Sequence, residues 1–308
     1  MTPSIAILIP CYNEESGIGE VVLSLRQQLP KADIYVYDNN SMDNTAEKAR
    51  AAGAIVRFEP RQGKGNVVRR MFADIDADIY LMIDGDGTYD ATVASQLADL
   101  LLKENLDMVV GIRKEESSTA HRSGHKFGNT LFNWVLSVLF KSHFKDIFSG
   151  YRVFSKRFVK SFPQLSSGFD IEAEISIYAL EMNLAVKEVE TSFFDRAEGS
   201  VSKLSTFKDG FRILWRMIFL FKEIKPMLFF GAFFVFFMLL SSALGYILVK
   251  EFIATGLVPR MPTAIVCVGS IILGFLSLAC GLILDSLSCA RREAKIMHYL
   301  SFKRPSAY

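Results

Sequence analysis

Two carboxylates one residue apart, Asp84 and Asp86, are the first residues whose spacing points to chemistry. They lie in IDGDGTYD (83–90) and directly follow the apolar residues 81–83. Residues i and i+2 of a strand share a face, so both side chains can point at one cation. Carboxylate oxygens suit Mg²⁺ or Mn²⁺, and an ion held by one or two carboxylates usually takes phosphate oxygens as further ligands. The alternative interpretation is a turn, because Asp-Gly pairs are also turn sequences.

Basic residues that could meet phosphate groups occur at several points along the chain. Lys64 lies in GKG (63–65), where glycine lets the backbone approach a ligand and lysine supplies a point charge. Arg113 follows an apolar segment, and Arg152 lies in SGYR (149–152). A further group lies in RAEGSVSKL (196–204): Arg196, Ser202 and Lys203. Taken singly, each of the other basic residues is better explained by a surface ion pair, and Lys64 is equally well explained as a surface lysine in a turn.

The elements that must position these residues alternate along the first part of the chain. Short buried strands are predicted at residues 5–10, 32–38, 54–58, 78–84 and 107–113, and helices at 15–29, 43–52, 64–76 and 91–104. This alternation predicts an α/β fold with a mostly parallel sheet covered by helices. Ligands of such sheets bind at the carboxyl ends of the strands. Six polar residues follow predicted strands and are expected to gather there: Asn13, Glu15, Asp38, Asp84, Asp86 and Arg113.

The overall composition excludes several classes of protein. The 308 residues carry a formal net charge of only +2, so no broad nucleic-acid-binding surface is expected. The four cysteines form no CxxC pair, which argues against a zinc site or a disulfide framework. The N-terminus lacks the basic region and long apolar stretch of a signal peptide.

Two charge-free stretches, residues 227–249 and 261–284, are each long enough to cross a bilayer, with buried core helices as the alternative. Basic residues before the first stretch and after the second predict that both termini face the cytoplasm, with the chain in the inner (cytoplasmic) membrane.

Aromatic and basic residues mix in 206–225, which indicates an amphipathic helix at the membrane surface; residues 127–145 fit membrane or core equally. The predicted order is a cytosolic catalytic domain (1–205), a juxtamembrane helix (206–225), a span (226–249), an extracytoplasmic loop (250–260), a second span (261–285) and a basic cytosolic tail (286–308).

Several motifs occur in the order found in family 2 glycosyltransferases. PCYNEE (10–15), VYDNNSMDNT (36–45), GKGNVVRRMF (63–72) and IDGDGTYD resemble the nucleotide-sugar half of that family. DIFSGYRVFSKR (146–157), GFDIEAEI (168–175) and GSVSKL (199–204) resemble the acceptor half. The resemblance covers residues 5–205 and implies the GT-A fold. With two C-terminal spans, the whole is similar to the polyprenyl-phosphate glycosyltransferases, which include dolichol-phosphate mannose synthase and bacterial undecaprenyl-phosphate sugar transferases.

The resemblance assigns donor-side roles residue by residue. It implies that the nucleotide is held by Pro10, Tyr12, Asn13, Glu15 and Asp38, with Lys64, Gly85 and Arg113 near the diphosphate. A helix or turn cap is the alternative role for Asp38. Asp84 and Asp86 correspond to the DxD site for Mg²⁺ or Mn²⁺. Thr88 stands where many relatives have glutamine, so water or the donor phosphate is expected to complete the ion's shell.

The acceptor-side roles follow in the same way. The resemblance implies that the acceptor phosphate meets Arg152, Arg196, Ser202 and Lys203. Of these, Arg152 and Lys203 would serve catalysis together with Asp86. Three carboxylates are candidates for a general base: Asp146, Asp170 and Glu172. The last two are equally explained as negative charge at the start of a helix. A phosphate monoester is already largely a dianion at cytosolic pH, so it needs little help from a base.

The implied reaction is metal-dependent transfer of a sugar, with inversion, from a nucleotide sugar to a polyprenyl phosphate at the cytosolic membrane face. A UDP-sugar is the expected donor, with a GDP-sugar as its competitor, and the two spans are compatible with a homo-oligomer. Another lipid acceptor and a non-catalytic, membrane-anchored nucleotide-sugar-binding protein are the alternatives. A processive polysaccharide synthase fits less well, because QxxRW is absent. A nicotinamide dehydrogenase is disfavoured because no GxGxxG follows the first strand.

Overall fold

The computed structural model describes residues 3–115, 144–163, 171–194, 215, 218–219 and 221–302. They divide into two units, one made of Met1–Ile213 with Lys295–Tyr308 and the other of Leu214–Ala294. The chain therefore leaves the first unit and later returns to it. In the sequence, the second unit is an insertion within the first.

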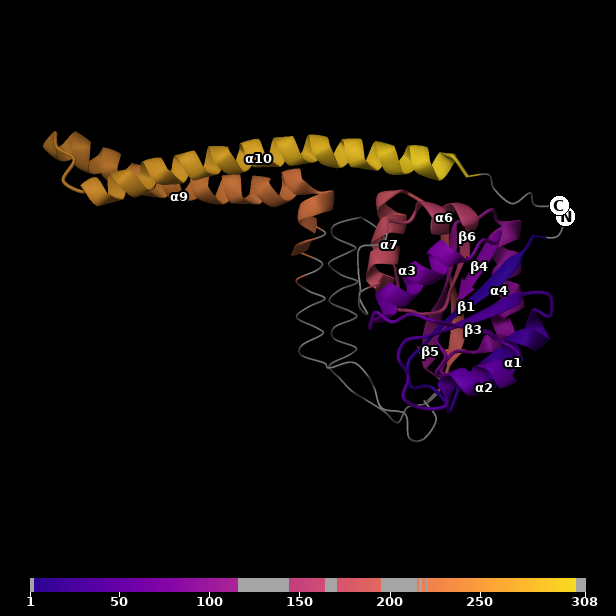
Figure 1. Cartoon of the computed structure of the whole chain (residues 1–308). Coiled ribbons are helices and arrows are strands. Elements are labelled where there is room, and N and C mark those ends of the chain that lie inside the picture. Colours follow the sequence, from indigo (N-terminus) through magenta and orange to yellow (C-terminus); the bar gives the residue numbers. More distant parts are fainter. Residues whose placement is uncertain are drawn as a thin grey trace. The chain divides into compact units, whose positions relative to one another are not determined.

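A seven-stranded sheet lies at the centre of the described part of the first unit (Figure 1). Its strands are β1 (Ile5–Cys11), β2 (Asp33–Asp38), β3 (Ile55–Phe58), β4 (Ile79–Met82), β5 (Met108–Glu115), β6 (Arg152–Ser155) and β7 (Val186–Phe193), in the order β3-β2-β1-β4-β6-β5-β7. Only β6 runs antiparallel to its neighbours, β4 and β5; the other pairs in the sheet are parallel. The predicted α/β fold with a mostly parallel sheet is confirmed.

Helices cover both faces of this sheet. They are α1 (Ile18–Gln28), α2 (Thr45–Ala51), α3 (Lys64–Asp74), α4 (Ala94–Lys103, after the short 3-10 helix η1, Ala91–Val93), α6 (Lys156–Ser161) and α7 (Ile171–Glu181). Figure 1 shows α1, α2 and α4 on one side and α3, α6 and α7 on the other. Apolar residues at helical spacing turn one stripe of α1 and one of α4 toward the sheet.

The two faces of the sheet have different cores. On the side of α1 and α4, aliphatic side chains from the helices pack against alternate residues of β1, β4 and β6, such as Ile7, Leu81 and Val153. On the side of α3, α6 and α7, an aromatic cluster fills the space: Phe72, Tyr80, Phe154, Phe158, Phe162 and Tyr178. Successive strand residues point to opposite faces, so one strand serves both cores. Strands β4 and β6 are consequently buried along their whole length, and β1 is buried from its second residue on.

The second unit contains two long apolar helices, α9 (Pro226–Thr255) and α10 (Met261–Leu300). Both are long and apolar enough to cross a membrane, with peak mean hydropathies of 2.3 and 2.4. They contact each other through a ring pair of Phe234 and Phe275 and through a hydrogen bond from Ser241 Oγ to the Cys267 carbonyl oxygen. Within the amphipathic stretch 206–225, the described positions 215, 218–219 and 221–224 are helical, and Lys225 separates them from α9. The other positions of this stretch lie outside the described residues, as does nearly all of 127–145.

The last helix extends beyond the predicted end of the span. Residues 286–300 contain neither proline nor glycine, so nothing in the sequence stops α10 before Leu300. We call residues 295–302 the C-terminal strap, because they pack within the first unit. Tyr299 donates a buried hydrogen bond of 2.7 Å to Asp107 Oδ1, and Lys295 forms an ion pair of 2.9 Å with Glu181. The Arg157 guanidinium lies over the Tyr299 ring and donates to the Phe302 carbonyl oxygen.

Candidate active site

The carboxyl ends of β1, β2 and β4 lie next to one another in the sheet, and the predicted donor-side residues follow them. Parallel register pairs Cys11 of β1 with Asp38 of β2, and the Asn39 amide donates to the Cys11 carbonyl oxygen. The loop carrying Asp84 and Asp86 follows β4, which pairs with the other side of β1. The topology therefore gathers these residues at one edge, as the strand pattern predicts.

Asp84 forms the most concentrated charge cluster at this edge. Lys64, the first residue of α3, places its Nζ 2.5 Å from Asp84 Oδ1 and 2.5 Å from Glu172 Oε1. The side chains are 25%, 11% and 6% exposed for Asp84, Lys64 and Glu172. Burial by itself would lower the pKa of Lys64, but the attraction of the two carboxylates outweighs it and raises that pKa above its usual value. Lys64 is therefore a charged ammonium held between two carboxylates.

Close backbone approach shapes the loop around Asp84. A Cβ on Gly150 would lie 2.4 Å from Asp84 Oδ2, and a Cβ on Gly85 would lie 2.5 Å from Cys11 Sγ. Both positions therefore require glycine in this arrangement. The Gly150 amide donates to the Tyr89 hydroxyl over 2.8 Å, which fixes the backbone against which the Asp84 carboxylate rests.

Asp86 lies deeper than Asp84 and is 8% exposed. Its Oδ1 accepts hydrogen bonds from the amide and the hydroxyl of Thr88, at 3.2 and 2.7 Å. Thr88 thus orients the second carboxylate. Among the described residues, no group of three or more His, Cys, Asp or Glu side chains is arranged to hold a metal ion. Two carboxylates fit Mg²⁺ or Mn²⁺ provided that phosphate oxygens or water supply the remaining ligands.

Asp38 provides a buried acceptor that fits a nucleotide. The residue is 7% exposed, and its Oδ2 accepts from the Ser41 amide over 3.4 Å. Its Oδ1 is buried and has no hydrogen-bond partner among the described residues. Buried carboxylate oxygens are ordinarily hydrogen-bonded, so an orphan at a strand's carboxyl end indicates a place for a ligand donor such as a ribose hydroxyl or a base N–H.

Asn39 has a role that the motif comparison does not indicate. Its Nδ2 donates to the carbonyl oxygens of Glu59 and Arg61, each over 2.8 Å, and its Oδ1 accepts from the Gly63 amide over 2.7 Å. Gly63 has a φ of 125°, a conformation that favours glycine. An aspartate at position 39 could accept from the Gly63 amide but could not donate to the two carbonyl oxygens. Asparagine therefore fixes the loop that delivers Lys64.

The remaining nucleotide-side residues bind the 12–15 loop to the 38–45 loop. Asn13 accepts from the Met42 amide over 2.8 Å and donates through its own amide to Ser41 Oγ. Glu15 Oε2 accepts from Asn44, so its carboxylate already serves the loop that starts α2. Pro10 lies in the buried part of β1, and Tyr12, the first residue after the strand, has intermediate exposure.

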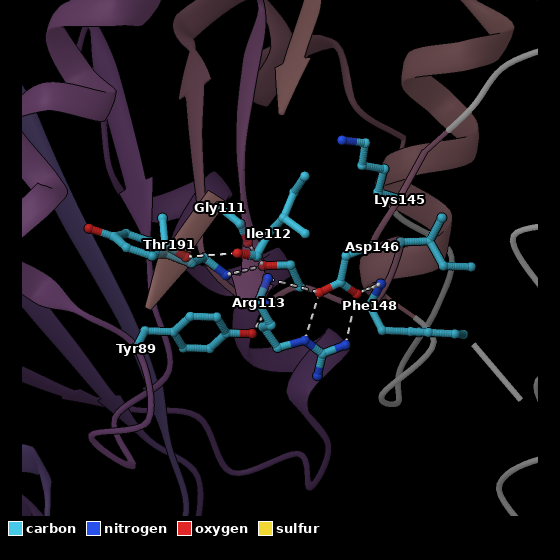
Figure 2. Close-up of polar contacts among 12 residues, drawn as sticks. Tyr89, Gly111, Ile112, Arg113, Lys145, Asp146, Phe148 and Thr191 are labelled. Carbon is cyan, nitrogen blue, oxygen red and sulfur yellow. Dashed lines mark hydrogen bonds and ion pairs between the residues drawn. The ribbon is translucent and has the colours of Figure 1, made fainter. Parts of the chain in front are cut away.

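Arg113 and Asp146 form a buried, forked ion pair (Figure 2). Arg113 Nε lies 2.7 Å from Asp146 Oδ2 and its second terminal nitrogen 2.7 Å from Oδ1, and the guanidinium lies over the Phe193 ring. Burial alone would lower the pKa of Arg113, but the hydrogen bonds to Asp146 raise it above its usual value. Both oxygens of Asp146 thus accept hydrogen bonds from the Arg113 guanidinium.

Arg152 lies in the core, and its surroundings do not match the predicted contact with an acceptor phosphate. The residue is fully buried in β6. Its guanidinium donates to the carbonyl oxygens of Ser149 and Ile147, at 2.8 and 2.7 Å, and to Ser176 Oγ at 3.0 Å. Burial lowers its pKa to about 10. These contacts make Arg152 a brace for the segment before β6, because its partners Ser149, Ile147 and Ser176 lie in the protein interior.

Of the other predicted acceptor-side residues, the structure describes only Glu172. Glu172 lies in the first turn of α7 and pairs with Lys64. Asp170, Arg196, Ser202 and Lys203 lie outside the described residues. The sequence analysis does not indicate the roles of Gly150 and Tyr89 at Asp84, because the contact between Gly150 and Tyr89 joins segments that lie far apart in the sequence.

Sequence comparison accounts for this combination of residues. The profile of glycosyl transferase family 2 matches residues 6–161, just over half of the chain. The chain belongs to glycosyl transferase family 2. The matched region contains Asp38, Lys64, Asp84 and Asp86 but ends before Glu172.

Individual relatives extend the match over most of this glycosyltransferase. Glycosyltransferase AglJ of Haloferax volcanii is 32% identical over 294 residues, which cover 94% of this chain and 95% of AglJ. Protein RfbJ of Shigella flexneri is 54% identical over 124 residues, 40% of this chain and 96% of RfbJ. A solved structure of glucosyl-3-phosphoglycerate synthase from Mycobacterium tuberculosis, in complex with Mn²⁺, uridine diphosphate and phosphoglyceric acid, is similar with a TM-score of 0.60 at 22% identity. That match covers 72% of this chain and 78% of the synthase, and it shows a shared GT-A-like fold.

Proposed function

We propose that this glycosyltransferase transfers a sugar, with inversion, from a nucleotide sugar to a polyprenyl phosphate at the cytosolic face of the inner membrane. The donor we propose is a UDP-sugar. The observation that carries the donor assignment is the orphan oxygen of Asp38 beside the cluster of Lys64, Asp84 and Asp86. The structural neighbour that binds Mn²⁺ and uridine diphosphate supports this assignment.

The donor-side residues would act on the diphosphate. Asp84 and Asp86 would hold Mg²⁺ or Mn²⁺, which when bound offsets the negative charge of the departing nucleoside diphosphate. Lys64 would add a second positive charge at the same place. Asp38 would accept a hydrogen bond from the ribose or the base and so fix the donor's orientation.

The acceptor side supports a reaction that needs no general base. Two of the candidate bases, Asp146 and Glu172, are buried in ion pairs with Arg113 and Lys64. Both oxygens of Asp146 and one oxygen of Glu172 are already engaged by these cations. A phosphate monoester attacks as a dianion and has no proton to lose, which fits this arrangement. A hydroxyl acceptor would need a base, so we favour a phosphate.

The lipid part of the proposal rests on the two apolar helices. Both could cross a membrane, and the basic residues flanking the pair favour cytosolic termini. A catalytic unit carried by such helices would meet a lipid acceptor at the membrane surface. The same features are compatible with a different lipid acceptor, which is the alternative proposal, and with a homo-oligomer in the membrane.

The test is to incubate the purified full-length chain with undecaprenyl phosphate and a panel of UDP- and GDP-sugars, with and without Mn²⁺. The expected product is a charged glycolipid on thin-layer chromatography, formed with a UDP-sugar and lost in Asp86→Ala. Asp99→Ala is the matched control, because Asp99 is an exposed aspartate on α4. Product formed only with diacylglycerol in place of the polyprenyl phosphate would favour the alternative, and no product with any donor would refute the proposal.

A further inference from the structure

Glu172 reaches the donor-side cluster from a distant part of the chain. It lies in the first turn of α7, beyond the residues matched by the family profile, and is 4% exposed. Its Oε1 lies 2.5 Å from the Lys64 ammonium, the same separation that Lys64 has from Asp84. A buried carboxylate from the acceptor half is therefore in direct contact with a residue of the donor half.

The ammonium group of Lys64 has three N–H donors. Two of them are directed at Asp84 and Glu172. Within the described part of the chain the third has no partner, and the position beside Asp84 is where the donor's diphosphate is proposed to bind. A lysine side chain has four rotatable bonds, so holding its head group in one place requires a partner.

The second carboxylate also changes the charge that a metal ion would meet. Lys64 with Asp84 alone would be a neutral pair, in which the ammonium competes with a cation for the same oxygen. With Glu172 present, the three side chains carry a net charge of −1, and Lys64 shares its attraction between two partners. The cluster therefore stays favourable to a divalent cation although it contains a lysine.

We propose that Glu172 is a positioning residue of the donor site, which anchors Lys64 so that its third N–H faces the donor's diphosphate and Asp84 stays available to the metal. This inference rests on the proposed nucleotide-sugar-binding function. It assigns Glu172 to the donor site rather than to proton transfer. It also makes donor binding depend on the α7 segment of the acceptor half.

The experiment is a double-mutant cycle on the full-length chain in detergent. Binding of UDP in the presence of Mn²⁺ is measured by calorimetry for wild type, Glu172→Gln, Lys64→Met and the double variant. The expected result is that Glu172→Gln weakens binding by about tenfold in the wild-type background, the effect of losing one charge-assisted hydrogen bond. In the Lys64→Met background the same substitution is expected to weaken binding no further, because its partner is gone.

The controls separate positioning from folding. Glu181→Gln removes a carboxylate from the same helix that also pairs with a lysine, Lys295, and it should leave UDP binding unchanged. If Glu172→Gln does not fold, Glu172→Asp gives the same comparison, because it keeps the charge but withdraws it by one methylene. Equal losses in both Lys64 backgrounds would overturn the inference while leaving the proposed function in place. A wild-type chain that binds neither UDP nor GDP with Mn²⁺ would instead overturn the proposed function and this inference with it.

Discussion

Replacing Gly150 with alanine tests whether the position of Asp84 controls activity. The added Cβ would lie 2.4 Å from Asp84 Oδ2, 2.8 Å from its Cγ and 2.9 Å from its Oδ1. Real Cβ atoms are essentially never found within 3.0 Å of another heavy atom, so the carboxylate must retreat by about 0.6 Å or more. The obstructed group is the end of a rotatable side chain, so it can move without unfolding the loop.

This retreat is expected to reduce activity much more than stability. Asp84 would lose its 2.5 Å contact with Lys64 and its place at the metal. A misplacement of about 1 Å in a catalytic arrangement can lower the rate by about 100-fold. We therefore expect turnover to fall by about 10- to 100-fold, together with a higher Mn²⁺ concentration for half-maximal activity. The free energy of unfolding should change by less than about 1 kcal/mol, as is usual when no packed core is disturbed.

The assay combines glycolipid formation across a Mn²⁺ titration with urea unfolding of the same preparation. Gly19→Ala is the matched control, because no atom lies within 4 Å of the Cβ that it would add. The control should keep full turnover. Wild-type turnover and metal dependence in Gly150→Ala would refute the view that the Asp84 carboxylate rests against this backbone. A large loss of stability in Gly150→Ala would equally contradict the reasoning.

Three further predictions concern buried side chains of the first unit. Tyr89→Phe removes a phenol whose pKa is raised by burial to about 12. The wild-type chain should therefore lose stability as the pH rises from about 10 toward 12, whereas the variant lacks this loss. In unfolding measurements, the wild-type stability should fall by about 1.4 kcal/mol per pH unit more than that of the variant. Arg152→Lys should cost about 2 to 4 kcal/mol of stability in urea unfolding, because one ammonium cannot replace a planar fork with three partners. Tyr299→Phe should cost about 1 to 3 kcal/mol, because Asp107 loses a buried donor.

Each of these variants has an outcome that would count against its assignment. The sign for Tyr89 follows from its raised pKa: above pH 10 the unfolded chain releases a proton that the folded chain retains, so stability must fall. A steeper fall in Tyr89→Phe would contradict this. Loss of turnover without loss of stability in Arg152→Lys would contradict the role of Arg152 as a brace and would favour the predicted contact with the acceptor phosphate. Tyr246→Phe, at an exposed position of α9, is the control for Tyr299→Phe, and equal effects of the two would contradict the strap contact.

The strand and helix pattern of the donor half could be predicted because each element there has a clear period or a clear boundary. The predicted strand at 32–38 corresponds to β2, and the predicted helix at 64–76 to α3, with Lys64 at its first residue. The gathering of Asp38 and Asp84 at one edge followed from the parallel order alone. The mostly parallel fold and the glycosyltransferase class were therefore accessible from residues and motifs.

The parts that could not be predicted depend on contacts between distant segments. The four buried residues of β6 show no alternation of polar and apolar side chains, and its insertion between β4 and β5 depends on antiparallel pairing with both. The sequence predicts Arg152 as a phosphate ligand, because a single arginine in a motif does not indicate whether its side chain is buried. The pairing of Glu172 with Lys64 joins residues far apart in sequence, for which no local pattern exists.

The C-terminal strap makes the connection between the two units a closed loop. Because Leu214–Ala294 is bounded by the first unit at both ends, the catalytic unit is attached to the apolar helices at two points. A single tether permits free rotation about itself, whereas two tethers remove most of that freedom. The contacts of Tyr299 and Lys295 close this loop without a covalent bond, and closing a long loop costs only slightly more entropy than closing a short one. Breaking the hydrogen bond between Tyr299 and Asp107 would therefore weaken the closure of this loop at its C-terminal end.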